Sequence, residues 1–240
     1  MQKVITCGCS FSETRYVQTW PIHFSAQFPN YKHIDTGMAS QGNGLISRTC
    51  IYKVSEALKT SKPENIIVGV MWSGPDRHDF YRDEPDGLSK SYRRNTEGWN
   101  ENPTGFINDH KHWFIANHYW KTRQAQVYYK YLHSFTGSLI LTLEHMLRTQ
   151  WFLEKNNIKY FMSTYMDHTL PINYITHNPS TSHLYDLLDM SKFLPVGGMG
   201  EWCRENTNLP FTEDDQHPSS EQHKVFTDNV IMPFWKKTYR

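Results

Sequence analysis

The sequence predicts an α/β fold in which a central parallel sheet lies between two layers of helices. Short buried-strand patterns occur at Lys3–Cys7, His33–Thr36, Ile66–Trp72 and Ile158–Ser163. Between the second and third of these, Leu45–Leu58 carries apolar residues at the spacing of one helical face. Strands that alternate with helices over short links form parallel sheets covered by helices, so we expect a three-layer α/β/α arrangement with long loop insertions.

The size and composition of the chain restrict what it can be. At roughly 150 residues per domain, its 240 residues make one large domain or two small ones, and we expect a single domain over residues 1–240. The formal net charge of +1 excludes the strongly basic surface of a dedicated nucleic-acid binder. Mean hydropathy is low at −0.67, but eight Trp, 14 Tyr and 13 Phe supply core material, which excludes global disorder.

The sequence shows neither a membrane-spanning segment nor a secretion signal. Its longest strongly apolar run, Ile66–Trp72, falls far short of the ~20 residues that a membrane-spanning helix needs. Met1–Ser12 holds one Lys and a short strand pattern in place of the apolar core of a signal peptide. We therefore expect a cytoplasmic protein that binds neither a membrane nor a nucleic acid.

No metal site or disulfide framework is predicted. The four cysteines are too few for a disulfide scaffold and lack the paired C-x-x-C spacing of zinc sites, so we expect reduced thiols. His110, His112 and His118 lack a carboxylate at a recognised metal-ligand spacing, and we interpret them as surface or structural residues. We expect neither a cofactor nor a metal.

Regular and glycine-containing pieces alternate in the first part of the chain. Lys3–Cys7 is followed by Gly8, which predicts a buried strand that ends in a tight turn. Tyr16–Phe28 predicts a helix that is interrupted near Pro21. Gly37–Gly44 follows the second strand and predicts an irregular connection into the next helix.

Two long segments, residues 76–118 and 165–210, break this alternation. Both are polar, aromatic and aperiodic, and both are too long for ordinary connections. Because each follows a predicted strand, we expect irregular insertions near a site, with much of the excess aromatic content forming a substrate surface.

Helical patterns occupy the rest of the second half. Tyr119–Asn156 shows one apolar stripe, and we expect a bend near Gly137. Ser219–Trp235 predicts a closing helix with Ser219 or Ser220 as its N-cap residue.

A serine follows the first predicted strand, in the run Gly8-Cys9-Ser10-Phe11-Ser12. Open α/β sheets place their sites at the carboxyl ends of strands, and a turn there exposes the Ser10 hydroxyl. Backbone N–H groups in such a turn can face a developing oxyanion. The alternative is a Ser-rich turn that caps the next helix, and the run alone does not exclude it.

An Asp three residues before a His precedes the closing helix, in the run Asp214-Asp215-Gln216-His217. On a loop, the Asp214 carboxylate can fold back onto Nδ1 of His217, which leaves Nε2 able to take a proton from a serine. The alternative is an acidic capping turn with a surface His.

The Gly-rich run Gly37–Gly44 follows the second strand. Glycines there let backbone N–H groups turn toward a ligand, as an oxyanion hole requires. The alternative is a flexible turn between a strand and a helix.

Together, the order and placement of these runs resemble the SGNH (GDSL-type) hydrolase family, which has a three-layer, flavodoxin-like α/β fold. The resemblance implies that Ser10 is the nucleophile, His217 the general base and Asp214 the acid that orients the imidazole. It also implies oxyanion donors at the backbone N–H of Ser10 and in the Gly-rich run, where Gly42 is our first choice and Ser40 the second.

The chain departs from the family pattern in two places. Cys9 stands where the family name has Asp. After its third strand the family shows Gly-x-Asn-Asp, whose Asn donates to the oxyanion, whereas this chain has the run Trp72–Arg77 with no Asn. The loss of one oxyanion donor costs ~10²–10³ in rate unless the Ser73 hydroxyl or the Arg77 guanidinium replaces it.

Several residues near the predicted site are candidates for substrate contact. We expect Arg77, Trp72 and Asn43 to bind substrate, although Asp76 and Arg77 could equally form a structural ion pair. Tryptophan rings can stack on sugars, although large aromatic residues also anchor loops to a core. The candidates are Trp72, Trp99, Trp113, Trp120 and Trp202.

These observations predict an SGNH-type serine esterase that hydrolyses an acyl ester, by family resemblance an O-acetyl ester on a carbohydrate. Its partner would be a small-molecule or glycan ester. The main alternative is a non-catalytic descendant of the fold with a binding or virion-associated role, which the missing Asn favours and the intact Ser10, Asp214 and His217 oppose. With its run Trp72–Arg77, the chain is also similar to SGNH-like proteins encoded by bacteriophages. A third interpretation is an acyltransferase that uses the same three residues.

Overall fold

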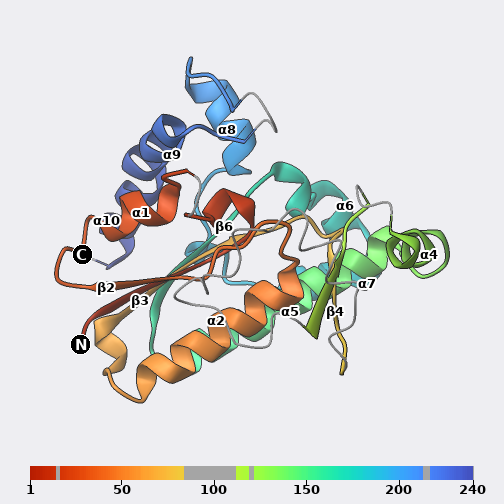
Figure 1. The fold of residues 1–240 in the computed structure, drawn as a ribbon, viewed down its shortest axis with the longest axis horizontal. Helices are drawn as coiled ribbons and strands as arrows, with labels where there is room; N and C mark the ends of the chain where they lie inside the picture. Colours follow the sequence, from red (N-terminus) through yellow and green to blue (C-terminus); the bar gives the residue numbers. More distant parts are fainter. Residues whose placement is uncertain (15–16, 84–111, 119–121, 213–216, 240) are drawn as a thin grey trace.

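The computed structural model describes residues 1–14, 17–83, 112–118, 122–212 and 217–239. At its centre is a parallel sheet of four strands in the order β2-β1-β3-β6 (Figure 1): β1 Lys3–Cys7, β2 Lys32–Asp35, β3 Ile66–Trp72 and β6 Lys159–Thr164. The predicted α/β class is confirmed, and each predicted strand is present with small shifts at its ends. Because the strands are parallel, their carboxyl ends meet at one edge of the sheet.

Helices cover both faces of this sheet (Figure 1). One layer contains α2 (Asn43–Leu58), α5 (Phe135–Lys155) and α7 (Pro179–Tyr185), and the other contains α1 (Trp20–Ser25), α9 (Ser220–Phe226) and α10 (Met232–Tyr239). Neighbouring strand residues enter opposite cores: Ile5 packs into the α2 and α5 side, whereas Val4 packs into the α1 and α9 side. Strands buried on both faces are typical of a parallel sheet between helices.

The two segments predicted to be irregular contain regular structure. In the first, β4 (His78–Tyr81) pairs antiparallel with β5 (Trp113–Ala116), and residues 84–111 lie outside the described residues. The second forms η4 (Asp167–Thr169), α6 (Ile172–His177), α7, η5 (Met190–Lys192) and α8 (Met199–Asn206). The prediction was wrong here because helices of six to eight residues are too short to show a clear period.

The two helix interruptions that the sequence predicts differ from what the structure shows. The long helical region is divided into α4 (Arg123–Tyr131) and α5, and Ser134 caps α5 by accepting the Gly137 N–H at 3.2 Å. The interruption predicted near Gly137 is therefore present, but it lies at Leu132–Ser134, and Gly137 itself is in the first turn of the second helix. In α1, Pro21 also lies in the first turn, where its missing N–H removes no intrahelical bond, so it begins the helix rather than interrupting it.

The closing helix is present and begins as predicted at Ser219. Its hydroxyl accepts the N–H of Gln222 while the Gln222 side chain accepts the N–H of Ser219, which completes a capping box. A π-helical turn, η6 (Thr227–Ile231), joins α9 to α10, and the helix continues past Trp235 to Tyr239.

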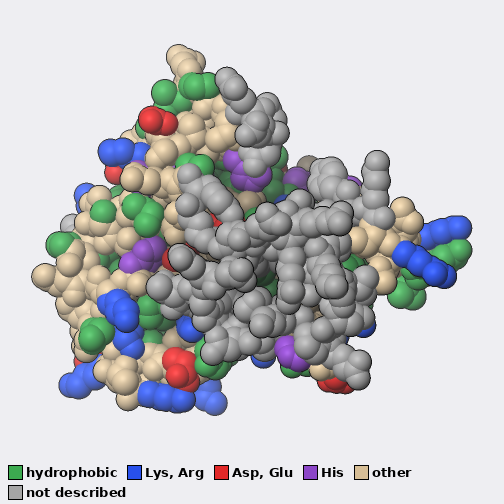
Figure 2. Space-filling model, in the orientation of Figure 1, with side chains coloured by type: hydrophobic (Ala, Val, Ile, Leu, Met, Phe, Trp, Pro, Cys, Tyr) green, Lys and Arg blue, Asp and Glu red, His purple; other side chains and the backbone are tan. Residues whose placement is uncertain are grey.

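The described surface is not uniform. On the face in Figure 2, basic side chains gather mainly around the C-terminal end of α2 and at α4. The α4 end also exposes large apolar side chains, among them Val127, Tyr131 and Leu132. Among the described residues, no helix has both the length and the apolar character that crossing a membrane requires.

Candidate active site

A serine and a histidine that are 207 residues apart in the chain meet at the carboxyl edge of the sheet. Ser10 begins a single 3-10 turn, η1 (Ser10–Ser12), shortly after β1 ends. Its Oγ lies 2.7 Å from Nε2 of His217, and both side chains are half-buried. At this distance an imidazole can accept the proton of a serine hydroxyl.

The turn that presents Ser10 depends on Gly8. A Cβ at this position would lie 2.9 Å from the backbone oxygen of Met71 and would collide with the side chain of Ser12. The Ser12 hydroxyl accepts the indole N–H of Trp20 at 2.9 Å, so it anchors the turn to the core. Ser10 is thus the hydroxyl that the turn presents to His217.

Thr212 fixes the loop that carries His217. The Thr212 N–H donates to the His217 oxygen at 2.9 Å, and the His217 N–H donates to the Thr212 hydroxyl at 3.0 Å. The imidazole also packs against the ring of Phe11, with 4.9 Å between the ring centroids. Asp214, the predicted orienting acid, lies outside the described residues.

A second imidazole behind this site has a structural role. Nδ1 of His223 accepts the backbone N–H of Trp20 at 3.2 Å, and the ring lies 6.4 Å from that of Phe11. Burial lowers the pKa of His223 to about 3, with the charges of His23 and His217 acting in the same direction. A neutral, buried His223 therefore serves as a fixed acceptor.

The Gly-rich run after β2 lies directly against the serine turn. The Gln41 amide donates to the Gly8 oxygen at 2.7 Å, and the Ala39 N–H donates to the Glu13 carboxylate at 2.7 Å. A Cβ at Gly37 would lie 2.8 Å from the Glu13 nitrogen, so this glycine permits the close approach of the two loops. The backbone of the run is thereby fixed beside the nucleophile.

The backbone N–H groups of the two proposed oxyanion positions in this run differ in whether they are already hydrogen-bonded. Ser40 has a left-handed backbone, with φ 64°, and its N–H, like that of Ser10, makes no hydrogen bond within the described part of the chain. The Gly42 N–H instead donates to Asp79 Oδ1 at 3.0 Å. The choice of Gly42 as an oxyanion donor was therefore wrong, because this N–H is already engaged.

Asp79 explains why glycine stands at position 42. Gly42 is the N-cap residue of α2 and has no side chain with which to cap it. The Asp79 carboxylate replaces that cap from β4, accepting the Leu45 N–H at 2.8 Å as well as that of Gly42. Any Cβ at Gly42 would lie 2.8 Å from Asp79 Cγ. Burial raises the pKa of Asp79 to about 6 in spite of these hydrogen bonds.

The side chain of Asn43 and the loop after β3 form a buried clamp. Asn43 Nδ2 donates to the Ser73 oxygen at 3.0 Å and to the Thr142 hydroxyl at 3.1 Å, and Asn43 Oδ1 accepts the Ser73 N–H at 2.8 Å. Trp72 is fully buried in the core. The prediction that Trp72 contacts substrate was therefore wrong, because its side chain is committed to packing. Asn43 is held in the clamp but also lines a cavity, so its contact with substrate stays a prediction. Ser73 is also fully buried, which removes its hydroxyl as a replacement oxyanion donor.

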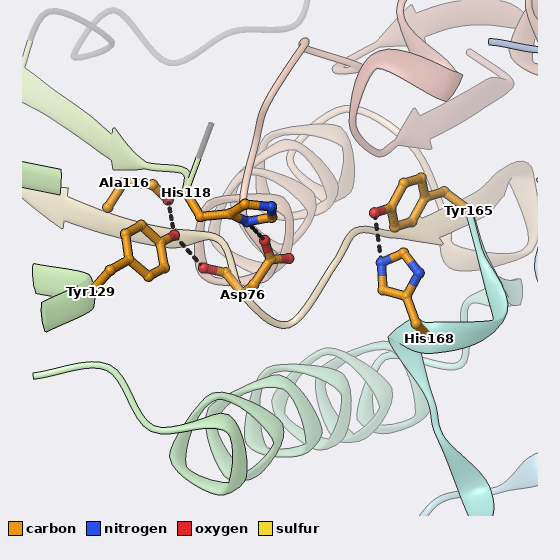
Figure 3. A network of polar contacts seen from close by, with 6 residues as sticks. All are labelled: Asp76, Ala116, His118, Tyr129, Tyr165 and His168. Atoms are coloured by element: carbon orange, nitrogen blue, oxygen red, sulfur yellow. Dashed lines mark hydrogen bonds and ion pairs between the residues drawn. The ribbon is translucent and has the colours of Figure 1, made fainter. Parts of the chain in front are cut away.

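Asp76 lies at the centre of a polar network after β3, shown in Figure 3. Its carboxylate lies 2.6 Å from Nδ1 of His118, and its backbone oxygen accepts the Tyr129 hydroxyl at 2.6 Å. Tyr165, the first residue after β6, pairs with His168 Nε2 at 2.8 Å on the other side of Asp76. The Asp76 carboxylate therefore has His118 as its partner, and no Asp76–Arg77 ion pair forms among the described residues.

Arg77 connects this network to the serine turn. Its guanidinium lies over the ring of Tyr165, 5.2 Å from the centroid, and within hydrogen-bonding reach of the Cys9 thiol. The Tyr165 ring in turn packs edge-on against Phe11 at 5.2 Å. The predicted site and the loop after β3 are thus in contact through aromatic rings.

A comparison with known proteins places the chain in a family. A model described as a family of unknown function, DUF6071, matches residues 6–239. The chain belongs to this family. No curated protein matches this DUF6071 member.

One similar solved structure is that of a Desulfitobacterium hafniense DCB-2 protein that is provisionally named as a lipolytic protein of the G-D-S-L family. Its TM-score is 0.45 at 13% sequence identity, and the match covers 95% of the DUF6071 chain and 97% of that chain. A likeness of this size assigns neither an activity nor site residues.

Some residues of the DUF6071 site could not be found from the sequence. Tyr165 and His168 lie in a segment without a period, and their pairing depends on contacts at the sheet edge. Asp79 was expected near the site, but its role as the cap of α2 could not be predicted. Trp113 lies beneath Arg48, and Trp202 packs against Phe226, whereas Trp99 and Trp120 lie outside the described residues.

His112 and the four cysteines lie within the described residues. His112 Nδ1 lies 2.8 Å from the Arg82 backbone oxygen, and His110 is outside the described residues. The four cysteines are buried and unpaired by disulfides. Within the described residues, no three potential ligands are grouped as a metal site.

Proposed function

We propose that this DUF6071 member is a serine ester hydrolase of SGNH type, with Ser10 as nucleophile and His217 as general base. The observation that carries the proposal is the 2.7 Å distance between Ser10 Oγ and His217 Nε2. A serine hydroxyl becomes a useful nucleophile near neutral pH when an adjacent base takes its proton. The carboxyl edge of a parallel sheet is also where α/β proteins place their sites.

The reaction follows from this pair. His217 Nε2 takes the Ser10 proton as Oγ attacks the ester carbonyl, and a tetrahedral oxyanion forms. The imidazolium then returns the proton to the leaving alkoxide, and an acyl-serine remains. His217 next removes a proton from the water that attacks the acyl group, and the imidazolium then returns this proton to Ser10 Oγ as the acid leaves. Asp214 is our proposed partner for Nδ1 of the imidazole.

The oxyanion would be bound by the backbone N–H groups of Ser10 and Ser40. Both lack a partner in the described part of the chain, and the left-handed backbone of Ser40 lies in a run fixed against the serine turn. Ser73 is buried, so the Arg77 guanidinium is the remaining candidate for the third donor, and its Nη1 has no hydrogen-bond partner among the described residues. If Arg77 does not reach the oxyanion, we expect turnover about 10²–10³ below that of an enzyme with the third donor.

The lack of the family Asn supports a second candidate, a weakly active or inactive binding protein of this fold. It requires that the Ser10 and Ser40 N–H groups bind too weakly to stabilise an oxyanion. An acyltransferase would use the same pair, with a sugar hydroxyl in place of water. An O-acetylated carbohydrate remains our first substrate to test, on the strength of the family resemblance.

Labelling and turnover together test the proposal. We expect wild-type protein to hydrolyse p-nitrophenyl acetate and to be labelled by a fluorophosphonate at Ser10. Ser10→Ala should lose the labelling and fall to the rate without enzyme, whereas Ser180→Ala, an exposed serine far along the chain, should behave as wild type.

The outcomes separate the candidates. Equal labelling of wild type and Ser10→Ala, or no turnover by wild type, contradicts the hydrolase. Acyl transfer to an added sugar in preference to water supports the acyltransferase. A wild type that binds acetylated sugars without turnover supports the binding protein.

A further inference from the structure

A cavity lies between α2, α5 and the β4–β5 pair, next to the loop after β3. Its volume is about 730 Å³, which is large enough for a small organic molecule. Its described lining includes three arginines and two histidines: Arg48, Arg77, His78, His145 and Arg148. Ser10 and His217 are not part of that described lining, so the cavity is distinct from the proposed catalytic pair.

Two of the guanidinium groups, those of Arg77 and Arg148, form no ion pair with a described carboxylate. Arg148 donates to neutral acceptors, the Ser47 hydroxyl at 3.1 Å and the Gly44 oxygen at 3.5 Å. Nη1 of Arg77 is buried and has no hydrogen-bond partner among the described residues. Guanidinium groups in such surroundings are suited to the bidentate binding of an oxyanion.

The two imidazoles add further polar atoms without a protein partner in the described part of the chain. Neither His78 nor His145 makes a side-chain hydrogen bond there, and His78 packs against the ring of Phe80 at 4.3 Å. Burial lowers the pKa of His145 to about 4, and the positive charges of Arg148 and His78 contribute. The ring is therefore neutral at pH 7 and carries one N–H donor and one acceptor nitrogen.

Gly44 allows His145 to pack closely against the start of α2. A Cβ there would lie 3.1 Å from His145 Nε2 and 3.3 Å from Asp79 Oδ2. The Arg148 guanidinium reaches the backbone oxygen of the same residue. His145 and Arg148 therefore both lie against Gly44, on the α2 side of the cavity.

The charge of the described lining is positive. Asp79 is its one carboxylate, and both oxygens already accept backbone N–H groups at the start of α2. Arg77 and Arg148 carry two positive charges that form no ion pair with a described carboxylate, and the neutral imidazoles add none. A phosphate monoester carries about two negative charges near neutral pH, so it matches this lining better than a carboxylate does.

We propose that this cavity binds a small organic molecule through a phosphate group, which Arg148, His145 and Arg77 hold. The organic part lies against the apolar wall formed by Ile51, Trp113 and Leu141. The proposal is independent of esterase activity, because it uses neither Ser10 nor His217.

Titration with inorganic phosphate tests this site. We expect saturable binding by calorimetry and a raised melting temperature, with weaker binding of acetate at matched ionic strength. Arg148→Gln should weaken phosphate binding by about 10- to 100-fold, because a hydrogen-bonded charge is removed. Gly44→Ala should weaken binding because its Cβ would displace the His145 ring, which lies only 3.1 Å from that position.

Arg204→Gln is the matched control, since Arg204 lies on α8 and is 3.9 Å from Glu201. It should bind phosphate as wild type does. Ser10→Ala should also retain phosphate binding, which separates this site from the proposed catalysis. The site is disproved if wild type shows no saturable phosphate binding, or if Arg148→Gln binds as tightly as Arg204→Gln while both melt as wild type does without phosphate.

Discussion

The loop after β1 and the loop after β3 lie at the same edge of the sheet but use their polar groups differently. In the first, Ser10 Oγ contacts His217, and the Ser10 N–H makes no hydrogen bond within the described residues. In the second, Ser73 is clamped by Asn43 and Asp76 is paired with His118. The polar groups of Ser10 in the β1 loop are therefore available to act on a substrate. Most polar groups of the β3 loop are instead hydrogen-bonded within the protein and stabilise the edge of the sheet.

The largest difference between the two loops should be in catalysis. If the β1 side is the reacting side, His217→Ala should lower kcat/KM for p-nitrophenyl acetate by about 10³-fold or more, because the Ser10 proton loses its acceptor. His183→Ala is the control, since His183 is an exposed histidine whose ring contacts only its own helix in the described structure. Activity of His217→Ala within tenfold of wild type would show that the pair does not act as a base and a nucleophile.

Substitutions in the contacts of the β3 loop should instead change the stability of the fold. Asn43→Ala removes three buried hydrogen bonds and leaves the Ser73 N–H without its partner. We expect the free energy of unfolding to fall by about 2–4 kcal/mol, measured by urea denaturation. Asn43→Asp keeps an acceptor for the Ser73 N–H but turns a buried carboxylate oxygen toward the Ser73 carbonyl oxygen, so it should lose at least as much. A loss below about 0.5 kcal/mol in both variants would show that the clamp is not a stabilising element.

Because Asp79 caps α2, its protonation should make the free energy of unfolding depend on pH. Burial raises its folded-state pKa to about 6, above the ordinary value of 3.8. The stability gained by protonation is therefore full below about pH 3.8 and is lost as the pH rises through about 6. Relative to Asp79→Asn, wild type should lose about 1–3 kcal/mol of unfolding free energy between these limits.

Urea denaturation of both proteins across this pH range measures the difference. Comparing the two is necessary because Asp35 has a pKa raised to about 6 by burial, while burial lowers that of His33 to about 4. These groups contribute equally to both curves and cancel in the difference. Parallel curves for wild type and Asp79→Asn would contradict the assignment.

The contrast between the loops also explains what the sequence could predict. The strand at Lys3–Cys7, the serine after it and the His before the closing helix are local patterns, and each has a recognisable spacing. Their meeting at one edge follows from the parallel order of strands, so the Ser10–His217 contact was predictable. To predict a contact of this kind, only the order and direction of the strands must be known.

The β3 side was not predictable for a physical reason. Asp79 caps a helix that begins 36 residues before it, counting from Asn43, and the need for glycine at position 42 arises from that contact. Trp72 has the chemistry of a ligand-binding residue, but the depth at which it lies decides that it packs. Burial and long-range partners are properties of the assembled fold, and single residue types do not reveal them.

The smallest effect is expected from the hydroxyl of Ser73. Its Oγ is buried and has no hydrogen-bond partner in the described part of the chain, while the backbone of the same residue is held at both ends by Asn43. Ser73→Ala removes an unsatisfied polar atom and keeps the backbone bonds, so the free energy of unfolding should change by less than about 1 kcal/mol, with any change stabilising. Esterase activity should stay within about twofold of wild type, since the hydroxyl is not an oxyanion donor. A fall of about tenfold or more in kcat with unchanged stability would reverse this assignment, and it would show that the β3 loop contributes a reacting group after all.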